Sequence, residues 1–134
     1  MDVVSIIGEA AVWGIGLAAV LMALDVLTGL SKAFSTKTFS SSVMRAGLWN
    51  KLGEGFALIL AVVVQVGGEH FDLGIASGVA AVVALYVCLM ELGSNLENIA
   101  ALSPQLAGSK FMGLFESTKG DVQTGGTGKA GDSE

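Results

Sequence analysis

Apolar residues are concentrated in three long blocks that short polar segments separate. The first block runs from Ala10 to Leu24, the second from Gly55 to Gly68, and the third from Leu73 to Met90. A helix needs about 20 mainly apolar residues to cross a bilayer. The third block meets this length almost unaided, whereas the first two must recruit flanking residues. We therefore predict membrane-spanning helices over about residues 4–29, 50–68 and 72–92.

Extension of the first two blocks brings ionisable residues to membrane depth. The first helix takes in Glu9, and the second takes in Lys51 and Glu54. Ionisable groups are unfavourable in hydrocarbon and usually face a partner or water. The alternative is a soluble bundle of three buried helices. Such helices carry a charged outer stripe, which these blocks lack, so the pattern favours the membrane.

Composition points the same way. The chain has 134 residues, the length of a single domain, with 52% hydrophobic and only 14% charged residues. Soluble domains carry about 25% charged residues. The net charge of -5 disfavours a nucleic-acid partner, and a single cysteine excludes an intramolecular disulfide.

Basic residues lie in one polar segment. The segment Ser31–Lys51 holds four of them and no acid, and its Ser/Thr cluster predicts a loop. The residues before the first block and the link at 67–72 hold acids and no lysine or arginine. Because basic residues in short loops stay on the cytoplasmic side, we expect this segment and the C-terminus inside and the N-terminus outside.

The chain changes character after the third block. No helix breaker occurs until Pro104, and residues 104–116 place Leu106, Phe111, Leu114 and Phe115 on one apolar face. This pattern predicts a short interfacial helix. Residues 117–134 are polar and glycine-rich, which predicts a disordered tail. The expected fold is therefore an all-α membrane domain over residues 1–116, with three transmembrane helices, followed by this flexible tail.

Motifs for catalysis or cofactor binding are weak. The tail segment GGTGKAG lacks the Ser/Thr and the preceding strand of a phosphate-binding loop. His70, beside Glu69 and Asp72, is typical of a solvated turn. No nucleophile–base pair or metal-ligand spacing occurs in the sequence. We expect no enzymatic activity, no metal and no cofactor.

One polar cluster follows the first block. Asp25, Thr28 and Lys32 share one helical face, with Gly29 beside it. Two interpretations stay open. Asp25 either marks the membrane boundary or pairs with one of the bases Lys32, Arg45 or Lys51.

A second polar cluster follows the third block. Glu91, Ser94, Asn95 and Asn98 form a stripe along one helical face, and Glu97 lies about one step off it. The stripe is either an ordinary amphipathic extension at the inner surface or a polar seam between helices or subunits.

Small residues recur at fourfold spacing within the spans. Ala10, Gly14 and Ala18 line one face of the first helix, and Gly74 and Gly78 form a GxxxG pair in the third. Small residues let helices approach closely in lipid. We expect these faces to pack against other helices, within one chain or between chains.

An ordered set of motifs resembles the small holins of phage lysis and toxin secretion. The motifs are DVLTG at 25–29, KAF at 32–34, the serines at 40–42, GLWNK at 47–51 and ELGSNLEN at 91–98. The family pattern E-x-x-S-x-x-E-N is matched by Glu91, Ser94, Glu97 and Asn98, and Pro104 is the candidate for the proline that follows. The resemblance covers about residues 15–106. The tail departs from it, because related proteins often end in a basic tail.

The resemblance implies a function that the residues alone do not give. Holins collect in the bacterial cytoplasmic membrane, form homo-oligomers and open lesions, through which a cell-wall hydrolase (an endolysin) or a toxin passes. Two alternatives remain. A small multidrug transporter carries a substrate-binding carboxylate in its first span, which Glu9 could imitate. A non-pore antiholin or scaffold subunit would insert and associate but leave the membrane sealed.

Overall fold

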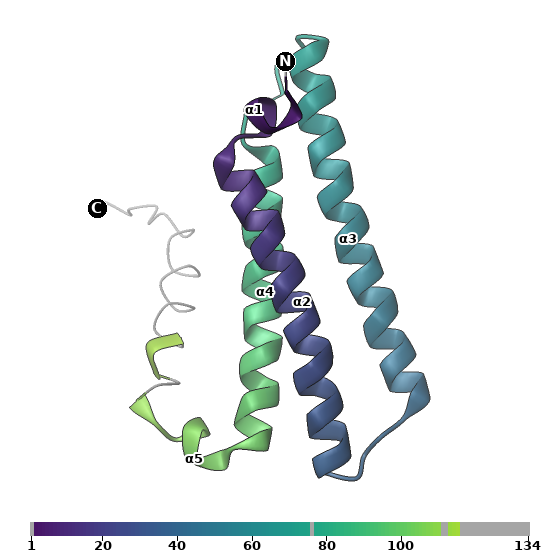
Figure 1. The fold of residues 1–134 in the computed structure, drawn as a ribbon, viewed down its shortest axis with the longest axis vertical. Helices are drawn as coiled ribbons and strands as arrows, with labels where there is room; N and C mark the ends of the chain where they lie inside the picture. The colour runs from purple at the N-terminus through teal and green to yellow at the C-terminus, as the bar shows by residue number, and fades with distance from the viewer. Residues whose placement is uncertain (1, 76, 111–112, 116–134) are drawn as a thin grey trace, which may run out of the picture.

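The fold is an elongated bundle of three long helices. The computed structural model describes residues 2–75, 77–110 and 113–115. Its elements are α1 (Val3–Ile7), α2 (Glu9–Ser35), α3 (Ser41–His70), α4 (Val79–Leu102) and α5 (Pro104–Ala107), and the described residues form no strand. α1 lies at one end of the bundle and α5 at the other (Figure 1). The predicted all-α class is confirmed.

The three long helices are suited to cross a membrane. α2, α3 and α4 have 27, 30 and 24 residues, and each is apolar enough to be a span. At ~1.5 Å per residue each exceeds the ~30 Å of a bilayer's hydrocarbon core. Large apolar side chains point outward, among them Trp13 at 77% and Trp49 at 69% exposure. A surface of this kind is expected to face lipid, since a soluble monomer rarely exposes such extended apolar patches.

The polar segment between the first two predicted spans contains the loop expected at its Ser/Thr cluster, but the rest of residues 31–51 is helical. α2 continues through Ser35 and α3 begins at Ser41, which leaves residues 36–40 between them. Hydroxyl groups near the end of α2 bond to backbone oxygens about one turn back. The Ser31 hydroxyl donates to the Leu27 carbonyl at 2.8 Å. Lys51 therefore lies within a helix, one of whose faces meets the other spans.

The GxxxG pair is not on a helix face, and that expectation is also wrong. α4 begins at Val79, and Gly74 and Gly78 precede it with φ of 65° and 93°. Glycine adopts this left-handed backbone readily because it has no Cβ. A Cβ on either residue would meet nothing within 4 Å. These glycines shape the α3–α4 connection rather than a helix contact.

The first span also starts later than predicted. Gly8 has φ of 81° and separates the short α1 from α2, so that the long helix begins at Glu9. Ile7 of α1 is buried with Ala11, Ala61 and Ala80, and α1 therefore folds over the end of the bundle.

Small residues bring α2 and α4 together along their length. A Cβ on Gly14 would lie 2.9 Å from the Ala84 Cβ, and Ala18 and Ala84 are fully buried. Leu58 of α3 joins the same buried cluster. α3 packs mainly on α4 and has little direct contact with α2. The bundle is therefore a close α2–α4 pair with a more loosely attached α3.

The close approach at Gly14 gives a first prediction. Gly14→Ala forces the Ala84 side chain or the helix to shift, and we expect it to lower the free energy of unfolding by about 1–3 kcal/mol. Gly16→Ala is the matched control, because a Cβ there meets nothing within 4 Å. Denaturant titration in detergent micelles measures both variants, and an equal effect of the two would contradict the packing.

Candidate functional site: a buried polar seam

The two polar stripes on α2 and α4 face each other. They meet in the half of the bundle that ends at the α2–α3 loop. Residues three, four and seven apart lie on one helical face, and this spacing aligns both stripes. We call the resulting contact the polar seam, which consists of Asp25, Thr28 and Lys32 on α2 and Glu91, Ser94, Asn95 and Asn98 on α4.

Both carboxylate oxygens of Asp25 are bonded. Oδ1 accepts the Ser94 hydroxyl at 2.5 Å and the Asn98 amide at 3.0 Å. Oδ2 lies 2.9 Å from the Lys51 ammonium of α3. Of the three bases that the sequence left open as partners, Lys51 is thus the one that pairs with Asp25. Lys32 instead donates to the Asn98 side-chain oxygen at 3.5 Å.

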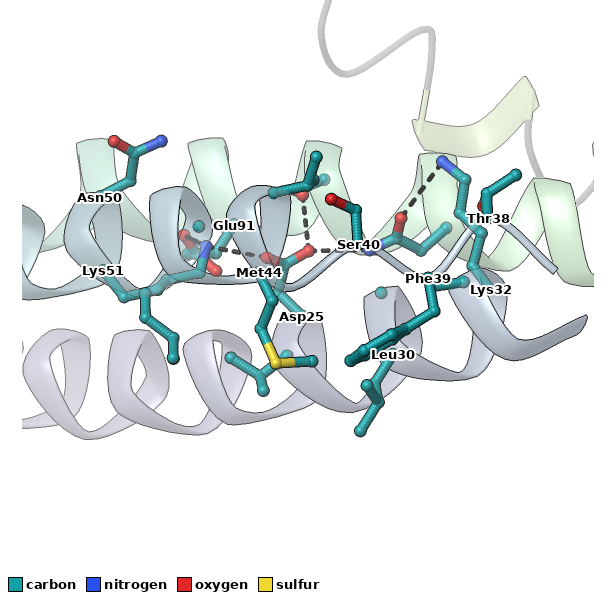
Figure 2. Close-up of a pocket in the computed structure, with 18 of the residues that line it drawn as sticks. Asp25, Leu30, Lys32, Thr38, Phe39, Ser40, Met44, Asn50, Lys51 and Glu91 are labelled. Carbon is teal, nitrogen blue, oxygen red and sulfur yellow. Dashed lines mark hydrogen bonds and ion pairs between the residues drawn. The ribbon is translucent and has the colours of Figure 1, made fainter. Parts of the chain in front are cut away.

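Lys51 joins all three long helices at one point. Its ammonium also donates to Glu91 Oε1 of α4, and Figure 2 shows Lys51 between Asp25 and Glu91. The Glu91 side chain is only 2% exposed. Asp25 and Lys51 lie about 15 Å from the loop ends of their helices, at ~1.5 Å per residue. The ion pairs therefore lie well inside helices that are long enough to span a membrane, and ionisable groups inside a span must be satisfied internally.

Amide side chains of α4 extend the seam from these ion pairs toward the C-terminal end of the helix. The Asn95 amide donates to the Leu21 carbonyl at 3.0 Å and to the Glu91 carbonyl at 2.8 Å. The Thr28 hydroxyl donates to Asn95 Oδ1 at 3.3 Å, and the Asn98 amide donates to that hydroxyl at 3.2 Å. Such bonds join helices in lipid, where an unpaired polar group is unfavourable.

A fourth charged residue, Glu54, adjoins the ion pairs. It lies one turn from Lys51, and its side chain reaches that of Glu91. We call Asp25, Lys51, Glu54 and Glu91 the ionic cluster. Oε2 of Glu54 and Oε2 of Glu91 are both buried, and neither has a hydrogen-bond partner among the residues that the structure describes.

A cavity of about 620 Å³ opens beside the ionic cluster. Lys51, Glu54 and Glu91 contribute to one part of its wall, and apolar residues of α2, α3 and the loop between them form much of the rest. Phe39 and Met44 belong to this apolar part (Figure 2). The charged groups thus border a space that protein side chains do not fill.

The other predicted site residues lie at the margins. A Cβ on Gly29 would be 3.5 Å from the Asn98 amide, so the absence of a side chain leaves room for Asn98. Glu97 is exposed and outside the seam. Pro104 stands in the first turn of α5, just after α4 ends, a position that suits its missing N–H. Glu9 is exposed at the start of α2 and does not line the cavity.

Sequence reasoning missed Gln65. This residue is 3% exposed; its amide donates to the Ile6 carbonyl at 3.1 Å, and its oxygen accepts the Ala80 N–H at 2.9 Å. It joins α1, α3 and the start of α4 at the end of the bundle opposite the loop. A lone amide within the apolar run of the second block was the signal that could have identified it.

Within the described ranges, no group of three or more His, Cys, Asp or Glu side chains is arranged to hold a metal ion. Part of the predicted interfacial segment, namely residues 111, 112 and 116, lies outside the described residues, as do the tail at 117–134 and its GGTGKAG motif.

Comparison with known proteins adds one finding. The model of the bacteriophage holin family matches residues 3–108, which include every residue of the polar seam. No curated protein and no solved structure matches the chain significantly.

Proposed function

Because this chain belongs to the bacteriophage holin family, we propose that it gathers as homo-oligomers in the bacterial cytoplasmic membrane and opens lesions there. The cargo would be a cell-wall hydrolase or a toxin, and the chain itself would perform no catalysis. The alternative is a non-pore antiholin, which would share this fold but leave the membrane sealed.

The observation that carries this proposal is the burial of the polar seam at membrane depth. A membrane anchor needs no such seam, since apolar side chains would pack with less desolvation. Polar groups inside a span usually mark a pathway for water, ions or solutes. In a single subunit most polar groups of the seam are bonded to one another. In a ring of subunits the same residues could line water.

The unequal attachment of the helices suggests how the seam opens. α2 and α4 are joined by close backbone approach along their length, whereas α3 makes fewer contacts and is tied to the other helices by the ion pairs of Lys51, the hydrogen bonds of Gln65 and a few buried apolar residues. Displacement of α3 would expose Asp25 and Glu91 to a neighbouring subunit or to water. We propose that assembly favours this displacement.

The distribution of charge supports one orientation. Lys37 and Arg45 lie at the end of the bundle that holds the α2–α3 loop, and Glu69 and Asp72 lie at the other end. Basic residues remain on the cytoplasmic side of a membrane. We propose that the α2–α3 loop faces the cytoplasm and that the N-terminus lies outside.

Co-expression tests the proposed function. The chain is produced in bacterial cells together with a cell-wall hydrolase that lacks an export signal. We expect abrupt lysis only when both proteins are present, and leakage of a cytoplasmic reporter enzyme with the chain alone. Insertion into the membrane fraction without lysis or leakage would contradict the proposal and favour the antiholin. Drug resistance without lysis would favour a transporter.

A charge substitution in the seam should change the timing of lysis. Glu91→Gln keeps the length of the span and removes one ion pair of Lys51, which weakens the attachment of α3. We expect normal insertion and an earlier onset of lysis. The onset is measured as the time at which the turbidity of the culture falls. Glu97→Gln is the matched control, because Glu97 is exposed on the same helix. Equal timing of both variants and the unmodified chain would contradict a role of the seam.

A further inference from the structure

Two buried carboxyl oxygens of the ionic cluster lack a donor. Lys51 donates to Asp25 Oδ2 and to Glu91 Oε1, and Asp25 Oδ1 is bonded by Ser94 and Asn98. Oε2 of Glu54 and Oε2 of Glu91 have no partner within the part of the chain that the structure describes. Buried polar atoms in native proteins are nearly always bonded, so these two atoms require an explanation.

The charges of the cluster do not balance. Four titratable groups face one another here: Asp25 from α2, Lys51 and Glu54 from α3, and Glu91 from α4. With every group ionised, three carboxylates would stand against one ammonium at membrane depth. Two carboxylates that share a site cannot both ionise readily, and an unbalanced charge in hydrocarbon is strongly unfavourable. One further positive charge would remove the repulsion between the two glutamates and halve the excess of negative charge.

The space at the two oxygens selects the cation. Each Oε2 atom exposes less than 1 Å², so that a water molecule, an ammonium group or a hydrated ion does not reach it. No metal-binding group of side chains is found in the described ranges. A proton needs no additional room, because it lies within the hydrogen bond that it creates between two carboxyl groups.

We propose that Glu54 and Glu91 form a proton-binding site, in which one proton is held between their Oε2 atoms and joins α3 to α4. The protonated carboxyl donates and the ionised one accepts, and Lys51 balances one of the two remaining negative charges. On release, the proton passes to water entering the adjoining cavity, and two adjacent negative charges remain on α3 and α4.

The site gives the opening of the bundle a pH dependence, and this consequence rests on the proposed function. With the proton bound, the Glu54–Glu91 bond holds α3 to the α2–α4 pair. With the proton lost, the two carboxylates repel each other and favour displacement of α3. Membrane permeabilisation should therefore rise as pH rises. Glu54→Gln supplies a permanent amide donor to Glu91 and should keep α3 attached at every pH.

Infrared spectroscopy of the full chain in lipid bilayers tests the site directly. Carbon-13 labelling of glutamate side chains identifies the carbonyl band of a protonated glutamic acid. We expect this band at neutral pH in the unmodified chain and in the control Glu97→Gln. We expect its loss in both Glu54→Gln and Glu91→Gln, with helix content unchanged. Absence of the band from the unmodified chain, or its persistence in both seam variants, would overturn the site.

Dye release from the same vesicles tests the consequence separately. The unmodified chain and Glu97→Gln should release dye faster at alkaline pH, and Glu54→Gln should release it slowly without pH dependence. A flat pH profile of the unmodified chain would overturn the coupling to α3. The infrared band is read on inserted protein whether or not dye escapes, so a failure of the proposed function is distinguishable from a failure of the proton site.

Discussion

Replacement of Lys51 by methionine is expected to destabilise the bundle by about 3–5 kcal/mol, the range for removal of one partner from a buried ion pair. The variant keeps an apolar stem of similar length but removes the ammonium that Asp25 and Glu91 share. Both carboxylates are then left without their cation at membrane depth. Lys51 is the polar tie that joins α3 to both α2 and α4, whereas Gln65 ties the opposite end of α3. The half of α3 next to the α2–α3 loop should therefore separate first.

This loss of unfolding free energy is measured in mild detergent by a denaturant titration that is monitored by circular dichroism. Arg45→Met on the same helix is the control. Arg45 is exposed and makes no ion pair with the residues that the structure describes, so its replacement should change the free energy of unfolding by less than about 0.5 kcal/mol. Similar stability of the Lys51 and Arg45 variants would contradict the role of the ionic cluster in holding α3.

Locking α3 to α4 is expected to abolish release. Ala61 of α3 and Ala80 of α4 belong to one buried cluster, and cysteines are introduced at both positions to be joined by a disulfide. In a Cys88→Ala background, oxidation should reduce dye release from vesicles to the level of protein-free vesicles, because α3 can no longer leave the seam. Reduction of the disulfide should restore release.

The matched control locks the pair of helices that is proposed to stay together. Ala18 of α2 and Ala84 of α4 are fully buried in a common cluster. A disulfide between cysteines at these positions should leave release nearly unchanged. Equal release from the oxidised and reduced α3–α4 variant would contradict displacement of α3.

The sequence predicted the spans because their signal is compositional. Long apolar blocks with few charges identify three membrane helices regardless of the details of packing. The two halves of the polar seam were also predictable, since Asp25, Thr28 and Lys32 on one helix and Glu91, Asn95 and Asn98 on the other follow helical periodicity. Periodicity places residues on a face of their own helix.

The partners across the seam were not predictable in the same way. Which base meets Asp25 depends on the rotation and the height of α3 relative to α2, and no local pattern encodes either. The proximity of Glu54 to Glu91 likewise depends on the rotation and the height of α3 relative to α4. α2 and α3 extend beyond the spans predicted at 4–29 and 50–68, because the apolar signal ends where the polar part of each helix begins. Gly74 and Gly78 were misassigned because spacing does not reveal the sign of φ.

Solvent accessibility of the α3-facing side of α4 shows whether the seam becomes lined by water when the membrane opens. Val87 is 2% exposed, packs with Leu58 of α3 and lies about one turn from Glu91, whereas Val82 is 68% exposed on the surface expected to face lipid. Each is replaced by cysteine in a Cys88→Ala background and treated with a membrane-impermeant maleimide.

We predict that Val87→Cys is unreactive before release begins and becomes labelled as dye escapes, while Val82→Cys stays unlabelled throughout. Complete release of dye with Val87→Cys still unreactive would contradict the account.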